Sequence, residues 1–157
     1  MESKLLEGRA REVCPACGWI HYEQLKVGAG VVIEKNGALL LLQRAHEPWR
    51  GSWNLPAGYA EVDEAPAQAA ERETFEETGL QVKTSELLGA YYFDNDPRGN
   101  GVLLVYACVV VEGDLRGSDE SQNMRYFTSN EILENIAGGG HMKAVADWKR
   151  GKFGMSK

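Results

Sequence analysis

Three glutamates in one short segment are spaced to hold a divalent cation. Glu76 follows Glu73 by three residues and Glu77 follows it by four, so on a helix their side chains project from one face. Unpaired, these carboxylates would repel one another, and the negative end of the helix dipole would disfavour them further. A hard cation such as Mg²⁺ or Mn²⁺, which prefers oxygen ligands, would relieve both penalties. The alternative is the solvated acidic face of a surface helix.

The loop before this segment favours the metal site over the solvated face. Residues 53–58 read Trp-Asn-Leu-Pro-Ala-Gly and end directly before the acidic segment. Gly58 has no side chain, so its carbonyl oxygen could approach the same cation. Arg72 adds a positive charge that could pair with Glu64 or Glu76. The predicted metal ligands are Glu73, Glu76, Glu77 and the Gly58 carbonyl.

Such a site would suit the hydrolysis of a phosphoric anhydride. A bound cation neutralises the phosphates and lowers the pKa of water, and a carboxylate can then take the proton. Arg44 or Arg50 could hold a phosphate oxygen, although a surface ion pair is the alternative for each. Trp49 is one of several aromatic residues that could stack on a base.

The helix that would carry the glutamates has recognisable boundaries. Asp63 or Glu64 can accept hydrogen bonds from the free amides at its start, and Pro66 suits its first turn. Its interior consists of strong helix formers, and Gly79 stands where a left-handed cap would end it.

Strands and two further helices are expected around it. The expected strands are 27–34, 38–44, 80–93, 102–111 and 124–127. Asn36 and Gly37 predict a hairpin turn between the first two, and the polar loop 94–101 could form a specificity wall. Thr128 and Glu131 have capping-box spacing, which predicts a helix before the last one, near 141–150. Because strands and helices do not alternate regularly, the fold class is α+β, with a mixed-sheet sandwich.

Composition narrows the class of protein. The 157 residues carry a net charge of -6, which argues against nonspecific binding of nucleic acid. No apolar run approaches the roughly 20 residues of a membrane span, and the start lacks a signal peptide's apolar stretch. We therefore expect a cytoplasmic protein that has neither nucleic acid nor a membrane as its partner, and the charge is compatible with a small anionic substrate.

Cys14 and Cys17 form a C-x-x-C followed by Gly18, which suits half of a zinc ribbon. His21 could supply a third ligand, but a closed structural zinc site needs four. The sequence therefore favours a cysteine-bearing turn without metal over a Zn²⁺ site.

Residues 58–80 resemble the signature motif of the Nudix (MutT-like) hydrolase family. The positions that match the motif are Gly58, Glu64, Arg72, Glu73, Glu76, Glu77, Gly79 and Leu80. Thr74 departs from it at an aliphatic position, which concerns packing rather than chemistry. Residues 27–127 resemble the whole Nudix domain, and we expect an N-terminal extension over 1–24 and the Nudix domain over 25–157.

The resemblance implies an α/β/α sandwich around a mixed sheet and water attack on a phosphorus of a nucleoside diphosphate derivative. The partner that it implies is a small-molecule nucleotide, and a homodimer, which many relatives form, is left open. The resemblance also implies Mg²⁺ held by the predicted ligands, with Arg72 and Glu64 orienting them. Glu61 would reach a second ion or a metal-bound water and is also a candidate substrate-binding residue. The general base remains open between Glu76 and Glu120.

The N-terminal segment bears on the substrate. Residues 14–22 resemble the second half of the zinc ribbon that precedes the Nudix domain in relatives acting on NADH, ADP-ribose or FAD. That resemblance implies an ADP-ribose-like or dinucleotide substrate. Two alternatives stay open: a nucleoside triphosphate pyrophosphohydrolase that sanitises the nucleotide pool, and a module that senses a nucleotide without cutting it.

Overall fold

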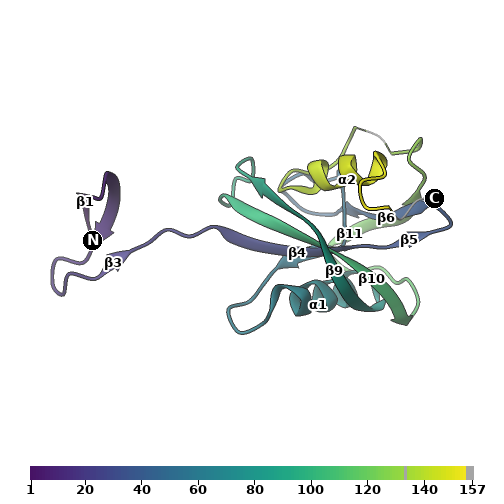
Figure 1. The fold of residues 1–157 in the computed structure, drawn as a ribbon, viewed down its shortest axis with the longest axis horizontal. Helices are drawn as coiled ribbons and strands as arrows, with labels where there is room; N and C mark the ends of the chain where they lie inside the picture. The colour runs from purple at the N-terminus through teal and green to yellow at the C-terminus, as the bar shows by residue number, and fades with distance from the viewer. Residues whose placement is uncertain (133, 155–157) are drawn as a thin grey trace.

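The computed structural model describes residues 1–132 and 134–154 (Figure 1). Its elements in chain order are β1 (Glu2–Leu6), β2 (Arg9–Val13), β3 (Ile20–His21), β4 (Lys26–Val32), β5 (Glu34–Lys35), β6 (Ala38–Arg44), β7 (Trp53–Asn54), β8 (Ala57–Tyr59), α1 (Pro66–Thr78), β9 (Gln81–Phe93), β10 (Gly101–Glu112), β11 (Ser121–Phe127) and α2 (His141–Lys149).

Two four-stranded sheet assemblies lie between the helices. One has the order β8-β4-β10-β9 and is mixed, because β4 and β10 run parallel while β8 and β9 pair antiparallel with them. The other has the order β11-β6-β5, with β7 paired to β6. Helix α1 covers one side and α2 the other (Figure 1). This arrangement confirms the α+β class and the predicted sandwich.

Each helix closes its own apolar core. Ala69 and Ala70 of α1 pack with Val31 and Leu40 in one cluster, whereas Trp148 of α2 belongs to the other. Trp148 is almost fully buried, and its indole N–H donates to a carboxylate oxygen of Glu34 at 2.7 Å. The C-terminal helix is therefore an integral part of the fold.

The predicted hairpin between the first two strands is confirmed. Lys35 pairs with Ala38 across β5 and β6, leaving a two-residue loop. Asn36 and Gly37 both adopt left-handed backbone angles, with φ of 52° and 76°. A two-residue hairpin turn of this type requires positive φ at both positions, which Asn and Gly tolerate best.

Helix α1 matches the prediction except at its first cap. Ala65, rather than Asp63 or Glu64, occupies the N-cap position, and its N–H donates to the Gln68 side chain at 3.0 Å. The Glu64 carboxylate instead accepts from Arg72. At the other end Gly79, with φ of 79°, forms the predicted left-handed cap.

The helix predicted after Thr128 is wrong. Among residues 128–132 and 134–140 the chain forms turns and one isolated bridge, between Ile136 and Trp53. Trp53 donates its N–H to Asn135 O at 2.9 Å and accepts from Ala137 N–H at 2.8 Å. The segment therefore satisfies its backbone against β7, which outweighs a local capping signal.

Strands β1, β2 and β3 form a separate three-stranded sheet, which lies apart from the rest of the molecule in Figure 1.

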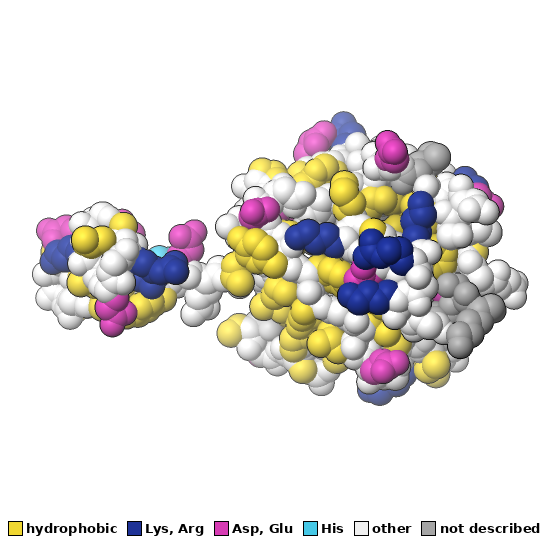
Figure 2. Space-filling model, turned by 45° about the horizontal axis from the view of Figure 1, so that its top comes forward, with side chains coloured by type: hydrophobic (Ala, Val, Ile, Leu, Met, Phe, Trp, Pro, Cys, Tyr) yellow, Lys and Arg dark blue, Asp and Glu magenta, His cyan; other side chains and the backbone are white. Residues whose placement is uncertain are grey.

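On the main body, lysines and arginines gather on the face that carries α2 (Figure 2). Asp147 lies among them, buried and accepting from Tyr91 and Lys152. In the described part of the chain, no helix is long and apolar enough to cross a membrane.

Candidate active site

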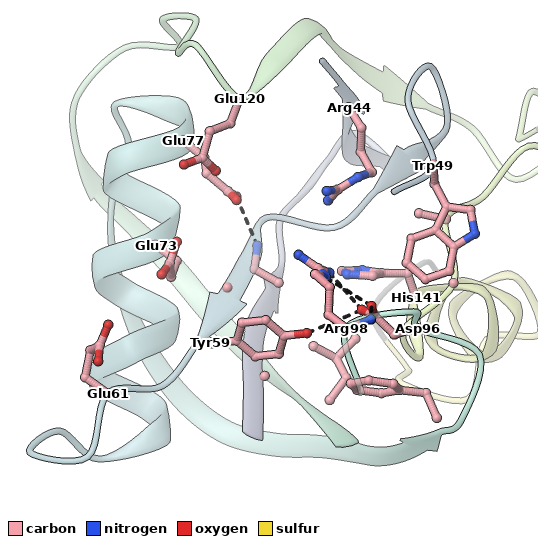
Figure 3. A pocket seen from close by; sticks show the side chains of 18 residues that line it. Arg44, Trp49, Tyr59, Glu61, Glu73, Glu77, Asp96, Arg98, Glu120 and His141 are labelled. Atoms are coloured by element: carbon pink, nitrogen blue, oxygen red, sulfur yellow. Dashed lines mark hydrogen bonds and ion pairs between the residues drawn. The ribbon is translucent and has the colours of Figure 1, made fainter. Parts of the chain in front are cut away.

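A cavity of about 330 Å³ lies where α1, β8 and the loops on either side of β11 meet. Side chains of opposite charge face each other across it (Figure 3). Carboxylates form one side, the acidic wall: Glu61, Glu73, Glu77 and Glu120. Guanidinium groups form the other side, the basic wall: Arg44 and Arg98. The volume is in the range of a small-molecule site.

The close approach of β8 to α1 explains the glycine at position 58. A Cβ atom placed on Gly58 would lie 2.1 Å from the carboxyl carbon of Glu73 and 2.3 and 2.4 Å from its oxygens. Any side chain there would therefore displace this carboxylate. Gly58 itself lines the cavity, as its predicted role as a backbone ligand requires.

Glu77 is the most deeply buried member of the acidic wall. Its carboxylate accepts one hydrogen bond, from the Ala57 N–H at 3.0 Å. Burial raises the pKa of Glu77 well above its ordinary value, and the nearby Glu73 and Glu120 raise it further. A charged Glu77 therefore lacks sufficient positive charge around it, which is the condition that a bound cation would correct.

Arg72 holds the acidic residues of α1 in place. Its guanidinium pairs with Glu64 at 2.6 Å, Glu73 at 2.8 Å and Glu76 at 3.2 Å, and it donates to the Tyr59 carbonyl at 3.2 Å. The sequence left the partner of Arg72 open between Glu64 and Glu76, and the structure contains both ion pairs. Hydrogen bonding to Arg72 lowers the pKa of Glu64 to about 2.

The two candidates for the general base differ in position. The side chain of Glu76 is 55% exposed, bonds Arg72 and does not line the cavity. Glu120, which precedes β11, lines the cavity together with Glu73 and Glu77. The structure thus brings Glu120, and not Glu76, to the cavity wall.

Of the residues predicted to bind the substrate, some line the cavity and one does not. Arg44 ends β6 and lines the cavity, with its Nε donating to Pro48 O at 2.7 Å. Trp49 lines it as well, in a left-handed conformation with φ of 61°. Arg50 is exposed and is absent from the cavity lining.

His141 was not predicted from the sequence. It begins α2, lines the cavity, and its Nδ1 accepts from the Leu55 N–H at 3.3 Å. Burial lowers the pKa of His141 to about 3, and Arg44 and Arg98 act in the same direction. The ring is therefore neutral at pH 7, with its proton on Nε2. Only the preceding run of three glycines signalled an unusual loop there.

The donor set of the acidic wall fits a hard cation, although the carboxylates are not gathered around one point. Within the described residues no three His, Cys, Asp or Glu side chains are close enough to form a metal-holding group. Arg72 instead draws Glu73 and Glu76 toward itself. Glu73, Glu77 and Gly58 nevertheless line one cavity and offer only oxygen ligands, as Mg²⁺ prefers.

The N-terminal cysteines share one tight turn. Gly18 N–H donates to Cys14 O at 2.9 Å, and Cys14 N–H donates to Trp19 O at 2.8 Å. Backbone N–H groups of Cys17 and Ala16 lower the pKa of the Cys14 thiol. Both thiols are free, and His21 lies on β3.

Comparison with known proteins identifies similar chains. The model of the NUDIX domain matches residues 12–148. An ADP-ribose pyrophosphatase of Methanocaldococcus jannaschii is 36% identical over 78% of this chain and 72% of its own length. A MutT-like protein of Streptomyces ambofaciens is 41% identical over 69% of this chain and 67% of its own length. The crystal structure of a NUDIX hydrolase from Nitrosomonas europaea superposes with a TM-score of 0.84 at 31% identity, covering 99% of this chain and 88% of that one.

Proposed function

Because this chain belongs to the NUDIX domain family and is a Nudix pyrophosphohydrolase, we propose that it cuts the diphosphate linkage of an ADP-ribose-like compound or a dinucleotide with a divalent cation. The observation that carries the proposal is that an acidic wall and a basic wall face each other across the cavity (Figure 3). Carboxylates alone would repel a diphosphate, whereas arginines opposite them attract it.

The predicted ligands would hold the cation at the acidic wall. Glu73, Glu77 and Gly58 line the cavity, and Glu76 is one helical turn from Glu73. When bound, Mg²⁺ or Mn²⁺ would neutralise phosphate charge and make water more acidic. Arg72, which pairs with Glu73 and Glu76 in the structure, would orient these ligands beside the cation.

In the reaction a water oxygen forms a bond to one phosphorus while the bridging P–O bond breaks, which gives two phosphate monoesters. Of the two candidate bases, Glu120 is favoured to accept the proton of the attacking water, because it lines the cavity and Glu76 does not. Arg44 would steady a phosphate oxygen, and Glu61 would contact the substrate or a second ion. Trp49 offers a ring to a base at the cavity edge.

The substrate class rests on two similarities. The Methanocaldococcus jannaschii relative is named an ADP-ribose pyrophosphatase, and this chain covers 72% of it. The C-x-x-C turn of residues 14–17 resembles part of the ribbon of dinucleotide-cleaving relatives. We further propose the division into an extension over 1–24 and a catalytic domain over 25–157, and a cytoplasmic location.

The test is a product analysis with matched variants. Purified protein is incubated with Mg²⁺ and ADP-ribose, NADH, FAD, diadenosine polyphosphates or nucleoside triphosphates, and products are identified by chromatography and mass. Glu73→Gln should lose most activity, whereas Glu86→Gln, an exposed glutamate of β9, should retain it. AMP plus a second phosphate monoester supports the proposal.

Two other outcomes would replace it. A nucleoside monophosphate plus pyrophosphate from a triphosphate would assign the enzyme to nucleotide-pool sanitation. Binding of ADP-ribose with no turnover in Mg²⁺ or Mn²⁺ would indicate a sensing module. Equal activity of Glu73→Gln and the wild type would remove Glu73 from the mechanism.

A further inference from the structure

In each arginine of the basic wall, the Nε proton is bonded to a protein oxygen. Arg44 donates its Nε proton to Pro48 O at 2.7 Å. Arg98 donates its Nε proton to one carboxylate oxygen of Asp96 at 3.0 Å and an Nη2 proton to the other at 2.7 Å. A guanidinium has five N–H donors, so each arginine keeps its Nη1 protons available, and Figure 3 shows both terminal groups directed into the cavity.

Asp96 holds the Arg98 guanidinium in place by accepting hydrogen bonds from it. Its side chain is almost fully buried, at 1% exposure, whereas that of Arg98 is 43% exposed. Asp96 also accepts from the Arg98 backbone N–H at 2.8 Å and from the Tyr59 hydroxyl at 3.3 Å. The Arg98 guanidinium carbon lies 5.3 Å from the centre of the Tyr59 ring. Contacts on two sides therefore fix the guanidinium, which reduces the entropy it would lose on binding an anion.

The two cations are close enough to affect each other. Burial lowers the pKa of Arg44, and the charge of Arg98 lowers it further. Placing like charges in a partly buried cavity is unfavourable unless an anion lies between them. Asp96 is engaged by Arg98, while Glu77 and Glu120 belong to the opposite wall.

We propose that Arg44 and Arg98 form a clamp that binds one phosphate of a diphosphate compound without needing a metal cation, while the other phosphate lies toward the acidic wall, where the proposed divalent cation would be held. Guanidinium groups match phosphate oxygens with paired hydrogen bonds. The neutral His141 ring supplies a third donor, because its Nδ1 is already bonded to the Leu55 N–H. In EDTA the clamp should therefore bind a phosphate-bearing nucleotide more tightly than adenosine, and only a bound cation would let the second phosphate approach the acidic wall.

This inference rests on the proposed function for the identity of the substrate. Binding of a phosphate by the two arginines can be tested separately, under conditions in which no cleavage occurs. Titration calorimetry in EDTA would compare ADP, AMP and adenosine with the wild type, Arg98→Gln and the control Arg125→Gln. Arg125 lies on β11 and pairs with Glu131 at 2.8 Å. Because Arg98→Gln removes charge-assisted hydrogen bonds to the phosphate, it should weaken ADP binding at least about tenfold. Arg125→Gln should leave it unchanged.

Further variants separate binding from folding. Arg98→Lys keeps the charge but loses the planar fork, so its ADP affinity should lie between those of the wild type and Arg98→Gln. Asp96→Asn should weaken ADP binding through Arg98 while adenosine binding stays the same. Circular dichroism spectra matching the wild type would show that these variants fold. In Mg²⁺, Arg98→Gln should raise KM more than it lowers kcat.

Failure of the clamp can be distinguished from failure of the proposed hydrolase function. Equal ADP affinity of the wild type and Arg98→Gln, or adenosine binding as tight as ADP binding, would overturn the clamp even if the enzyme cuts ADP-ribose. Metal-free ADP binding that depends on Arg98 would support the clamp even if no substrate is cut.

Discussion

Replacement of Glu77 by Gln should stabilise the metal-free protein. The side chain is buried beside Glu73 and Glu120 and accepts only the Ala57 N–H. Glutamine keeps a carbonyl oxygen for that hydrogen bond and removes the charge. A buried charged group that lacks a partner costs about 1–3 kcal/mol or more, so Glu77→Gln should recover roughly that amount in EDTA at pH 8. For a chain of this size the midpoint of thermal unfolding should rise by roughly 2–10 °C.

The pH dependence has a definite sign. The pKa of Glu77 in the folded state lies above the ordinary value of 4.5. The Glu77 side chain therefore makes its full contribution to the stability of the folded protein below pH 4.5. This contribution is lost as the pH rises through the folded-state pKa. The stability advantage of Glu77→Gln should be small near pH 4.5 and should grow toward pH 8.

Thermal unfolding followed by circular dichroism checks both statements. The wild type, Glu77→Gln and Glu86→Gln are compared in EDTA and in excess Mg²⁺. A ligand at a hundredfold excess over its Kd adds about 2.7 kcal/mol, so the wild type should gain stability in Mg²⁺ and Glu77→Gln should gain less. If Glu77→Gln is less stable than the wild type in EDTA at pH 8, the buried charge is compensated and this reasoning is refuted.

Three further predictions concern the site and the core. Gly58→Ala should push the Glu73 carboxylate away from β8 and lower kcat about 100-fold in a steady-state assay, with a smaller change in KM; full activity would show that the carboxylate position is not critical. Because the pKa of His141 falls from 6.5 to about 3 on folding, the unfolded state takes up the proton as the pH falls from 6.5 to 3. Wild-type stability should decrease over that window, by up to about 1.4 kcal/mol per pH unit, and His141→Gln should be less sensitive in urea unfolding at pH 7 and pH 5. Trp148→Ala should cost about 3–5 kcal/mol in urea unfolding, whereas Trp148→Phe, which mainly loses the bond to Glu34, should cost about 1 kcal/mol.

The elements that could be predicted from sequence are those defined by local chemistry. Asn36 and Gly37 specify a turn by their own backbone preferences, and Gly79 specifies a helix end in the same way. The helical spacing of Glu73 and Glu77 likewise places both carboxylates on the cavity side of α1. Periodicity could not separate Glu77 from Glu76, since neighbouring residues diverge by about 100° around the helix and only packing decides which one faces inward.

The errors arise where distant segments compete with local signals. Thr128 and Glu131 have the spacing of a helix start, yet the chain there bonds Trp53 on both its N–H and its carbonyl. His141 joins the cavity because Leu55, far away in the chain, donates to its ring. No pattern within a short window contains such information.

The site contains both residues that lie close together in the sequence and residues that only folding brings together. Two members of the acidic wall, Glu73 and Glu77, come from α1, where the helical repeat fixes their spacing and Arg72 pairs with Glu73. The basic wall comes from the end of β6 and from the loop that carries Asp96 and Arg98. Loops tolerate change more readily than the helices and strands they join. On the proposed function, the metal ligands are therefore encoded in a contiguous motif, whereas Glu120 and the arginines that would bind phosphate, Arg44 and Arg98, come together only in the folded chain.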